Sequence, residues 1–351
     1  MPAAENPAAH PPEARQPGTL RPGARAASSG GPGAPQQEGA ASGSSRAVVR
    51  SEAPGGWSGE FAAPQPGGAA GAPFRALVDA GWLAERIGAP GVVVFDASVG
   101  AHRGSDRRIP GARPFDLDGD LSDHDAPAPH TMPAPERFAE SMRALGIDDD
   151  TAAVVVYDGA GIYSSARAWW MLRAMGFDRA AVLDGGLPAW TAAGLPLESA
   201  APAYRGPRGS FTARPRPGLL VDADAVAAAL ADPAAAVLDA RTRGRFAGTA
   251  PEPRPGLRAG HMPGALNLPF GELQRDGGLM RPAEELRAAF QDLVGQRERL
   301  RFSCGSGVTA CVLALGAELA GYRDLAVYDG SWSEWGAPSA QRPVITGEGG
   351  G

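Results

Sequence analysis

The sequence predicts an α/β protein made of two related domains in tandem, each a parallel sheet flanked by helices. Short apolar runs, typical of buried strands, alternate with segments of helical spacing. The same series of motifs occurs twice, about 145 residues apart, which indicates a duplicated domain. A length of 351 residues also suits two domains. We therefore expect domains at residues 73–198 and 219–345, joined by a Pro-, Arg- and Gly-rich linker at 199–218.

The first 72 residues form a separate region of unusual composition. Ala, Gly and Pro fill 42 of these 72 positions, and large apolar residues are few. Such a chain cannot bury enough apolar surface to offset the entropy that it would lose on ordering. We therefore predict a disordered extension over residues 1–72. We expect no secretory signal, because a basic start and a continuous apolar core are missing. The Arg, Ser and Ala content would suit an organellar transit peptide, but the glutamates argue against it, and a tail translated from an upstream start is an equal alternative.

Charge, hydropathy and cysteine content exclude several classes of protein. A net charge of −6 gives no reason to expect nucleic-acid binding. No apolar run approaches the ~18 residues that a membrane-spanning helix needs, so we expect no membrane contact. Two cysteines do not make a disulfide framework, and a reactive free thiol fits a reducing compartment. We therefore expect a cytoplasmic protein.

Strands and helices alternate through the first domain. Residues 77–87 have the spacing of a helix with an apolar stripe. The later elements are predicted in the order strand 92–95, helix 135–145, strand 153–157, helix 164–175 and strand 181–183. Three tryptophans of this half are expected in the core or between the domains: Trp169, Trp170 and Trp190.

The second half repeats these features in the same order. Residues 236–239 correspond to 93–96, 262–265 to 109–112, 329–330 to 184–185, and Trp335 to Trp190. At one pair of positions the halves differ in kind, because Cys304-Gly305 stands where the first half has Asp158-Gly159.

Cys304 lies in a segment that predicts a strand, a tight loop and a helix. An apolar run precedes it, Gly305, Ser306 and Gly307 follow, and residues 308–319 suit a helix. Small residues let backbone N–H groups turn inward around the cysteine, and the N-terminus of the helix adds partial positive charge. Both effects favour the thiolate, which is the nucleophilic form. The plainer alternative is a buried, inert cysteine, which would not need three small residues in succession.

Residues 304–309, Cys-Gly-Ser-Gly-Val-Thr, resemble the active-site loop of the rhodanese superfamily, and within it that of the 3-mercaptopyruvate sulfurtransferases. The resemblance extends over roughly residues 75–340 and implies two tandem rhodanese-like domains. It implies that Cys304 takes a sulfane sulfur from 3-mercaptopyruvate as a persulfide, with release of pyruvate. Cyanide, thioredoxin or a small thiol would then accept the sulfur, with no metal or organic cofactor. Asp158 cannot carry this sulfur, so we expect the first domain to be non-catalytic.

A second polar segment, residues 239–254, is rich in arginine. Arginine grips a carboxylate with two parallel hydrogen bonds and keeps its charge. The matching segment of the mercaptopyruvate sulfurtransferases has a Gly-Arg-Phe/Tyr and a Pro-Glu-Pro-Arg stretch, whose arginines bind the carboxylate and ketone ends of the substrate. The match implies a set of substrate-binding residues made of these two arginines and the loop after the cysteine: Arg245, Arg254, Gly305, Ser306, Gly307, Val308 and Thr309. We expect Arg241 to form a structural ion pair and Arg243 to be a solvated surface charge.

None of the five histidines has the spacing of a metal-ligand set. His261 resembles the histidine of the family's His-x-Pro-Gly motif, which is mostly structural. Relatives often carry a histidine just before Ile-Pro-Gly-Ala in the first domain, and some family mechanisms invoke a Ser–His–Asp relay through it. Arg108 stands in that place here. The missing histidine argues against such a relay, so we assign Ser306 to hydrogen bonding rather than to a base-activated role. The sequence leaves open whether another residue replaces that histidine, and His130 matches a family segment to which we assign no role. Cys311, two helical turns after Cys304, is expected in the core.

Three other functions are alternatives. A thiosulfate:cyanide sulfurtransferase usually has one or two basic residues between the cysteine and Gly-Val-Thr, where this chain has Gly305 and Ser306. A phosphatase of the same fold needs an arginine at the sixth position after the cysteine, which is Ala310 here. A non-catalytic binding protein with a degenerate domain would not need an intact cysteine loop with substrate arginines. Gain of one sulfur on Cys304 after donor treatment distinguishes an enzyme from a binding protein.

Overall fold

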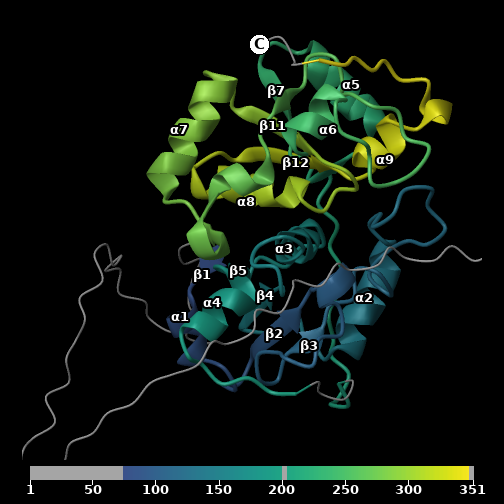
Figure 1. The fold of residues 1–351 in the computed structure, drawn as a ribbon. Helices are drawn as coiled ribbons and strands as arrows, with labels where there is room; N and C mark the ends of the chain where they lie inside the picture. The colour runs from purple at the N-terminus through teal and green to yellow at the C-terminus, as the bar shows by residue number, and fades with distance from the viewer. Residues whose placement is uncertain (1–73, 200–203, 348–351) are drawn as a thin grey trace, which may run out of the picture. The chain divides into compact units, whose positions relative to one another are not determined.

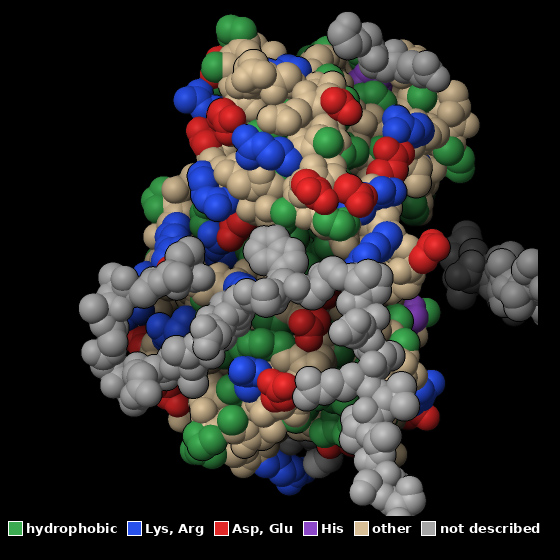
Figure 2. All heavy atoms as spheres, turned by 90° about the vertical axis from the view of Figure 1, so that its left-hand side faces the viewer, with side chains coloured by type: hydrophobic (Ala, Val, Ile, Leu, Met, Phe, Trp, Pro, Cys, Tyr) green, Lys and Arg blue, Asp and Glu red, His purple; other side chains and the backbone are tan. Residues whose placement is uncertain are grey.

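The computed structural model describes residues 74–199 and 204–347. The extension predicted over residues 1–72 lies outside these described residues, as do residues 200–203 of the predicted linker. No helix in the described ranges has both the length and the apolar character needed to span a bilayer. On the face of the molecule drawn in Figure 2, basic and acidic side chains are interspersed rather than gathered into a patch of one sign.

The first domain is built on a five-stranded parallel sheet with the strand order β1-β5-β4-β2-β3 (Figure 1). Its strands are β1 (Leu77–Val78), β2 (Val92–Asp96), β3 (Arg113–Pro114), β4 (Ala153–Tyr157) and β5 (Ala180–Leu183). Its helices are α1 (Ala80–Ala84), α2 (Pro135–Ala144), α3 (Ser165–Ala174) and α4 (Gly186–Ala192), with a short 3-10 helix η1 (Gly100–His102).

The second domain has the same architecture, with the strand order β6-β12-β11-β7-β8 in a parallel sheet. Its strands are β6 (Leu220–Val221), β7 (Ala235–Asp239), β8 (Leu266–Asn267), β11 (Arg299–Ser303) and β12 (Asp324–Tyr328). Its helices are α5 (Ala223–Ala231), α6 (Arg243–Ala247), α7 (Ala283–Val294), α8 (Ala310–Leu319) and α9 (Ser331–Trp335). An antiparallel pair, β9 (Gln274–Arg275) with β10 (Leu279–Met280), and the 3-10 helices η2 (Phe270–Leu273), η3 (Asp276–Gly278) and η4 (Pro338–Ala340) complete it.

Each sheet buries both of its faces, which explains the apolar runs in the sequence. In β2, Val93 and Phe95 belong to one buried cluster and Val94 belongs to the cluster on the opposite face. Strands of a parallel sheet that is covered on both sides must be apolar at successive positions rather than at alternate ones. The predicted tandem α/β architecture is therefore confirmed, and the two sheets share one strand order.

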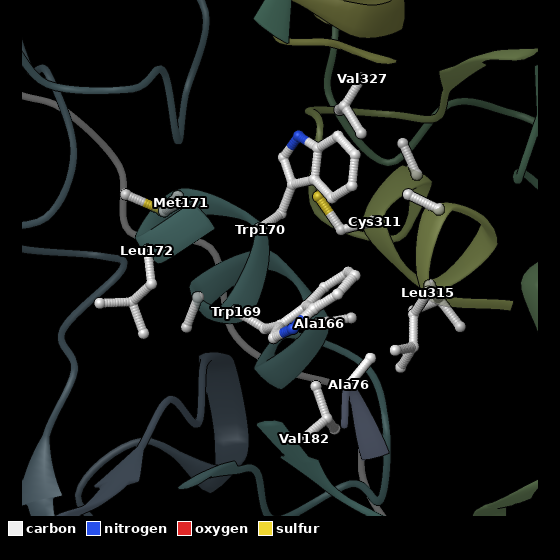
Figure 3. Close-up of a cluster of buried hydrophobic side chains, with 14 of the residues drawn as sticks. Ala76, Ala166, Trp169, Trp170, Met171, Leu172, Val182, Cys311, Leu315 and Val327 are labelled. Atoms are coloured by element: carbon white, nitrogen blue, oxygen red, sulfur yellow. The ribbon is translucent and has the colours of Figure 1, made fainter. Parts of the chain in front are cut away.

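Helix α3 of the first domain packs against helix α8 of the second. Trp169 and Trp170 of α3 are almost completely buried, as predicted, and Figure 3 shows their rings facing the side of α8 that carries Cys311 and Leu315. All four side chains belong to one buried cluster that includes residues of both domains. Burial of such large aromatic rings makes this helix pair a strong contribution to the docking of the domains.

One predicted segment differs from the structure. The helix expected over residues 77–87 is preceded by a strand, because Leu77 and Val78 pair with β5, and α1 begins only after Asp79. The Asp79 carboxylate accepts the N–H of Trp82 at 2.8 Å and caps the helix. A two-residue strand has too short a period to be separated from a helix by pattern alone.

The predicted linker packs on the first domain. Phe211 is 1% exposed and lies edge-on to Phe138, with ring centroids 5.9 Å apart. Its N–H donates to the carbonyl of Ile147, and that of Gly209 donates to Arg143. The described part of this segment is therefore fixed to the first domain by both backbone hydrogen bonds and a buried ring.

Candidate active site

Cys304 directly follows β11, which pairs in parallel with β7 on one side and β12 on the other. The carboxyl ends of neighbouring parallel strands are where α/β folds place their sites. The Cys304 N–H donates to Ser331 Oγ at 3.1 Å, and its carbonyl accepts the N–H of Trp332 at 3.0 Å. Helix α9 thus holds the cysteine backbone, and the residue is 1% exposed.

The loop from Gly305 to Thr309 has unused hydrogen-bond donors. Within residues 74–199 and 204–347, the N–H groups of these five residues donate to no protein acceptor. Gly307 has φ +74°, and a Cβ there would lie 2.8 Å from the carbonyl oxygen of Asp329, so only glycine fits. Helix α8 begins at Ala310 and adds the partial positive charge of its N-terminus. Free N–H groups beside a helix N-terminus suit an anion.

The corresponding loop of the first domain has its donors occupied. Asp158 Oδ2 accepts the N–H groups of Tyr163, Ser164 and Ser165 at 2.8–3.0 Å, and Oδ1 accepts that of Ala160 at 2.9 Å. Asp158 is 1% exposed. A carboxylate of the chain itself therefore fills the position where the second domain presents Cys304 and open donors. That the first domain is not catalytic on its own stays a prediction.

The two arginines implied by the resemblance meet beside the cysteine loop. A Cβ on Gly305 would lie 3.1 Å from Nη2 of Arg245 and 3.8 Å from Nη1 of Arg254. Arg245 lies in α6 and is paired with Glu252, its Nη2 donating to Oε2 at 2.6 Å. Arg254 is half-buried, donates to Ser306 Oγ at 3.4 Å and forms no ion pair with any carboxylate in the described part of the chain. The structure thus brings both guanidinium groups to Gly305, and their role in substrate binding stays a prediction.

The other two arginines of this segment have the environments expected of them. Arg241 is fully buried and pairs with Asp239 at 2.7 Å and with Glu252 at 2.8 Å, so it is a structural ion pair. Glu252 therefore links Arg241 to Arg245. Arg243 is 67% exposed and pairs with Glu272 at the surface.

A hydrogen-bonded chain of serine, histidine and aspartate is present, contrary to the prediction. His130 Nδ1 lies 3.0 Å from Ser306 Oγ, and His130 Nε2 lies 3.0 Å from Asp118 Oδ1. A carboxylate can only accept, so Nε2 carries the proton and Nδ1 accepts the Ser306 hydroxyl. Burial lowers the pKa of His130, although Asp118 acts to raise it, so the site favours the neutral imidazole.

The argument against the relay was wrong because it considered only the position beside the Pro-Gly turn, which is occupied by Arg108. The histidine comes instead from a loop about twenty residues further along the first domain and reaches Ser306 across 176 positions of the sequence. His130 has φ +60°, which is rare outside glycine and indicates a backbone held in place by its surroundings. Arg108 itself forms an antiparallel bridge with Glu198.

Other residues named in the sequence have structural environments. His261 is completely buried, stacks on Phe246 with centroids 3.7 Å apart and bonds through Nδ1 to the Phe246 carbonyl, as expected of a structural histidine. Cys311 is a core residue, as predicted, and its Sγ donates to the carbonyl of Gly307 at 3.2 Å. Burial raises the pKa of the Cys311 thiol to about 12.

Tyr163 is a residue near the site that the sequence did not indicate. It follows the Asp158 loop of the first domain, is 37% exposed and packs edge-on against Phe270 at 5.6 Å. Burial raises its pKa, negative charge on Cys304 raises it further, and Arg245 and Arg254 lower it, so its hydroxyl is within electrostatic reach of the cysteine. The first domain therefore contributes both His130 and Tyr163 to the surroundings of Cys304.

Comparison with known proteins agrees with this fold and site. A family model described as a rhodanese-like domain matches residues 79–193 and 222–338. The chain is 42% identical over 277 residues to the 3-mercaptopyruvate sulfurtransferase of Escherichia coli K12, covering 76% of this chain and 96% of the relative. It is 40% identical over 289 residues to the mitochondrial thiosulfate/3-mercaptopyruvate sulfurtransferase 1 of Arabidopsis thaliana, covering 74% and 75%.

Among solved structures, the crystal structure of SseA from Escherichia coli is similar, with a TM-score of 0.65 and 38% sequence identity. The match covers 74% of this chain and 100% of that one. The two profile matches fall one in each α/β domain and together span more than half of the sequence. The chain therefore belongs to the rhodanese-like family and carries two rhodanese-like domains in tandem.

Proposed function

We propose that this protein is a sulfurtransferase that moves a sulfane sulfur from 3-mercaptopyruvate through a persulfide on Cys304 to an acceptor, with release of pyruvate. The observation that carries the proposal is the convergence of two guanidinium groups on Gly305, next to a cysteine whose loop has free N–H donors. A keto acid with a thiol needs a nucleophile for its sulfur and cations for its carboxylate and ketone. The relatives named above as acting on this donor add support.

In the first half-reaction the Cys304 thiolate attacks the sulfur of the donor. An S–S bond forms, the C–S bond breaks, and the electron pair moves onto carbon as the enolate of pyruvate. The enolate takes up the proton lost by the donor thiol. Free N–H groups from Gly305 to Thr309 stabilise negative charge on sulfur, and Arg245 and Arg254 hold the organic acid.

Ser306 and His130 offer a route for the proton. The neutral imidazole accepts the Ser306 hydroxyl at Nδ1 and is oriented by Asp118 at Nε2. Ser306 is the first hydroxyl after the cysteine in the loop and also accepts from Arg254, one of the two arginines proposed to hold the organic acid. We assign it the transfer of the proton between the donor thiol and the enolate carbon.

In the second half-reaction the outer sulfur passes to a nucleophile. We propose a thiol such as thioredoxin or a small thiol as the acceptor, with cyanide as a substitute in the assay. Thiolate attack on the outer sulfur forms the new S–S bond and returns Cys304 as the leaving thiolate. No metal or organic cofactor takes part in these steps. Both cysteines are free, which suits the reducing conditions of the cytoplasm, and we propose that location.

Thiosulfate is the second candidate donor, and one observation favours it. Thiosulfate carries its charge next to the transferable sulfur and needs cations close to the cysteine loop. Gly305 and Ser306 supply none, but Nη2 of Arg245 lies against Gly305 itself. The arginines are therefore close enough to serve either anion, and the relative from Arabidopsis thaliana carries both donors in its name.

The test is mass spectrometry after donor treatment, followed by steady-state kinetics with both donors. We expect one sulfur to be gained on Cys304, and higher kcat/KM with 3-mercaptopyruvate than with thiosulfate. Cys304→Ser should abolish transfer because a serine hydroxyl is not ionised at neutral pH. Cys311→Ser is the matched control and should retain most activity, because its thiol has a pKa of about 12. Turnover by Cys304→Ser would contradict the mechanism, and preference for thiosulfate would contradict the donor assignment alone.

A further inference from the structure

Arg167 is a charged residue in the first turn of α3 that has no exposed surface. Its Nη2 donates to Asp329 Oδ1 at 2.5 Å, and Asp329 follows β12 in the other domain. A buried ion pair is weak evidence for stability, because the cost of taking charge out of water offsets its Coulombic gain. The α3–α8 contact already has the buried rings of Trp169 and Trp170, so the ion pair calls for a different explanation.

Both members of this ion pair also hold one short stretch of backbone. Arg167 Nη2 donates to the carbonyl of His130 at 2.9 Å, and Asp329 Oδ2 accepts the N–H of Met132 at 2.8 Å. The ion pair thus forms backbone hydrogen bonds with the residues on both sides of Thr131. This is the stretch in which His130 adopts φ +60°, a conformation that persists only when contacts enforce it.

The same ion pair also lies beneath the cysteine loop. A Cβ on Gly307 would lie 3.4 Å from Nη1 of Arg167 and 2.8 Å from the carbonyl oxygen of Asp329. Arg167 Nε and Nη1 have no hydrogen-bond partner among the described residues. The positive charge of the guanidinium therefore lies against the loop without being tied to it by a hydrogen bond. The Arg167–Asp329 ion pair therefore contacts both the backbone of residues 130–132, which carries His130, and the loop that contains Ser306.

We propose that Arg167 and Asp329 are positioning residues that hold His130 on Ser306 and so join the two halves of the active site across the domain boundary. The inference rests on the proposed function for its kinetic consequence only. The His130–Ser306 bond is 3.0 Å long, and it depends on placing a ring from one domain against a hydroxyl from the other. A displacement of about 1 Å in such a contact is enough to cost on the order of 100-fold in rate.

The chain offers a matched control on the same helix. Arg173 of α3 pairs with Glu318 of α8, which also links the two domains, but it touches neither the 130–132 segment nor the cysteine loop. Arg167→Met and Arg173→Met therefore each remove one cation of α3 that bridges the domains. If the ion pair only docks the domains, the two variants should behave alike.

The test measures turnover of 3-mercaptopyruvate and the imidazole signals of ¹⁵N-histidine-labelled full-length protein. For Arg167→Met we expect kcat to fall by roughly 10- to 100-fold with little change in KM, and the His130 signals to shift. For Arg173→Met we expect kcat to stay within about two-fold of the wild-type value and the His130 signals to stay unshifted. His130→Asn identifies the His130 signals, and the double variant Arg167→Met/His130→Asn should lose no more than His130→Asn alone.

Equal losses in the two arginine variants, or losses that multiply in the double variant, would overturn the proposal. Asp329→Asn keeps the shape of the side chain and repeats the test if Arg167→Met does not fold. The imidazole signals need no donor, so they decide the positioning role even if the wild-type protein proves inactive with 3-mercaptopyruvate. In that case only the proposed function fails.

Discussion

The sequence predicts the same role, substrate binding, for Arg245 and Arg254, but the two arginines have different partners in the structure. Arg245 is fixed by Glu252, which already neutralises part of its charge. Arg254 has no carboxylate partner among the described residues and contacts Ser306. An unpaired guanidinium has the most to gain from a substrate carboxylate. We therefore expect Arg254 to contribute more to donor binding than Arg245.

The first prediction follows from this difference. Arg254→Ala removes a charge-assisted contact worth about 1.5–3 kcal/mol, so kcat/KM for 3-mercaptopyruvate should fall by roughly 10- to 150-fold. The loss with thiosulfate should be clearly smaller, because its charge lies next to the transferable sulfur, where Arg245 is the nearer cation, and it has no carboxylate for Arg254 to hold. Arg243→Ala, which removes an exposed charge of the same segment, is the control and should change neither value. Equal losses with the two donors would show that Arg254 does not select the organic acid.

A second prediction concerns the titration of His130. Burial holds its pKa below 6.5, Asp118 acts to raise it, and Arg254 and Arg167 act to lower it. An NMR titration of ¹⁵N-labelled protein should therefore place the His130 pKa below 6.5. Asp118→Asn should lower the pKa further, and Arg254→Ala should raise it. A shift in the opposite direction in either variant would contradict the arrangement of charges around the imidazole.

The same pKa shift has a consequence for stability. The folded state favours the neutral imidazole, so its pKa in the folded protein lies below that in the unfolded chain. The associated stability is fully present above pH 6.5 and is lost as the pH falls through 6.5 toward the folded-state value. Protonation also removes the acceptor for the Ser306 hydroxyl, so activity and stability should decline in the same pH range.

At the scale of elements, the sequence was most informative where an element is long and buried on both sides. Strands β2 and β4 and helices α2 and α3 were predicted to within one or two residues, because apolar runs and helix ends leave clear patterns. Strand β1 was missed because two residues carry no period. The packing of Phe211 was missed because a single apolar residue among Pro, Arg and Gly does not indicate which surface it will cover.

The loop that holds Asp158 gives a prediction at this scale. One carboxylate satisfies four backbone N–H groups there, three of them at the start of α3. Asp158→Ala leaves all four donors without this acceptor, and those of Ser164 and Ser165 are buried, so it should lower the free energy of unfolding by at least about 2 kcal/mol. Asp178→Ala removes a surface ion pair with Arg216 and should cost less than about 1 kcal/mol. Urea unfolding measures both, and a cost for Asp158→Ala no larger than that for Asp178→Ala would show that water replaces the carboxylate.

At the scale of the whole molecule, the duplication predicts two domains, of which only the second carries the nucleophilic cysteine. In the structure the nucleophile belongs to the second domain alone, but the hydrogen-bonded side chains around it come from both domains. His130 and Asp118 come from the first domain, and Ser306 and Cys304 come from the second. Contacts between residues so far apart in the sequence leave no periodic trace, and a single sequence offers no paired changes from which to infer them. Cys304 and the two arginines could be named because each lies in a local motif.

The last prediction concerns the extension, whose composition gives it few apolar anchors. Deleting residues 1–70 should shift the melting temperature by less than about 2 °C and leave kcat/KM unchanged, because a segment of this composition has few large apolar side chains with which to pack on the domains. Deleting residues 1–90 is the control, since it also removes β1 and α1 with the buried side chains of Val78 and Leu83. It uncovers the edge of β5, so it should cost several degrees or prevent folding. A loss of several degrees in the shorter deletion would mean that the extension packs on the domains.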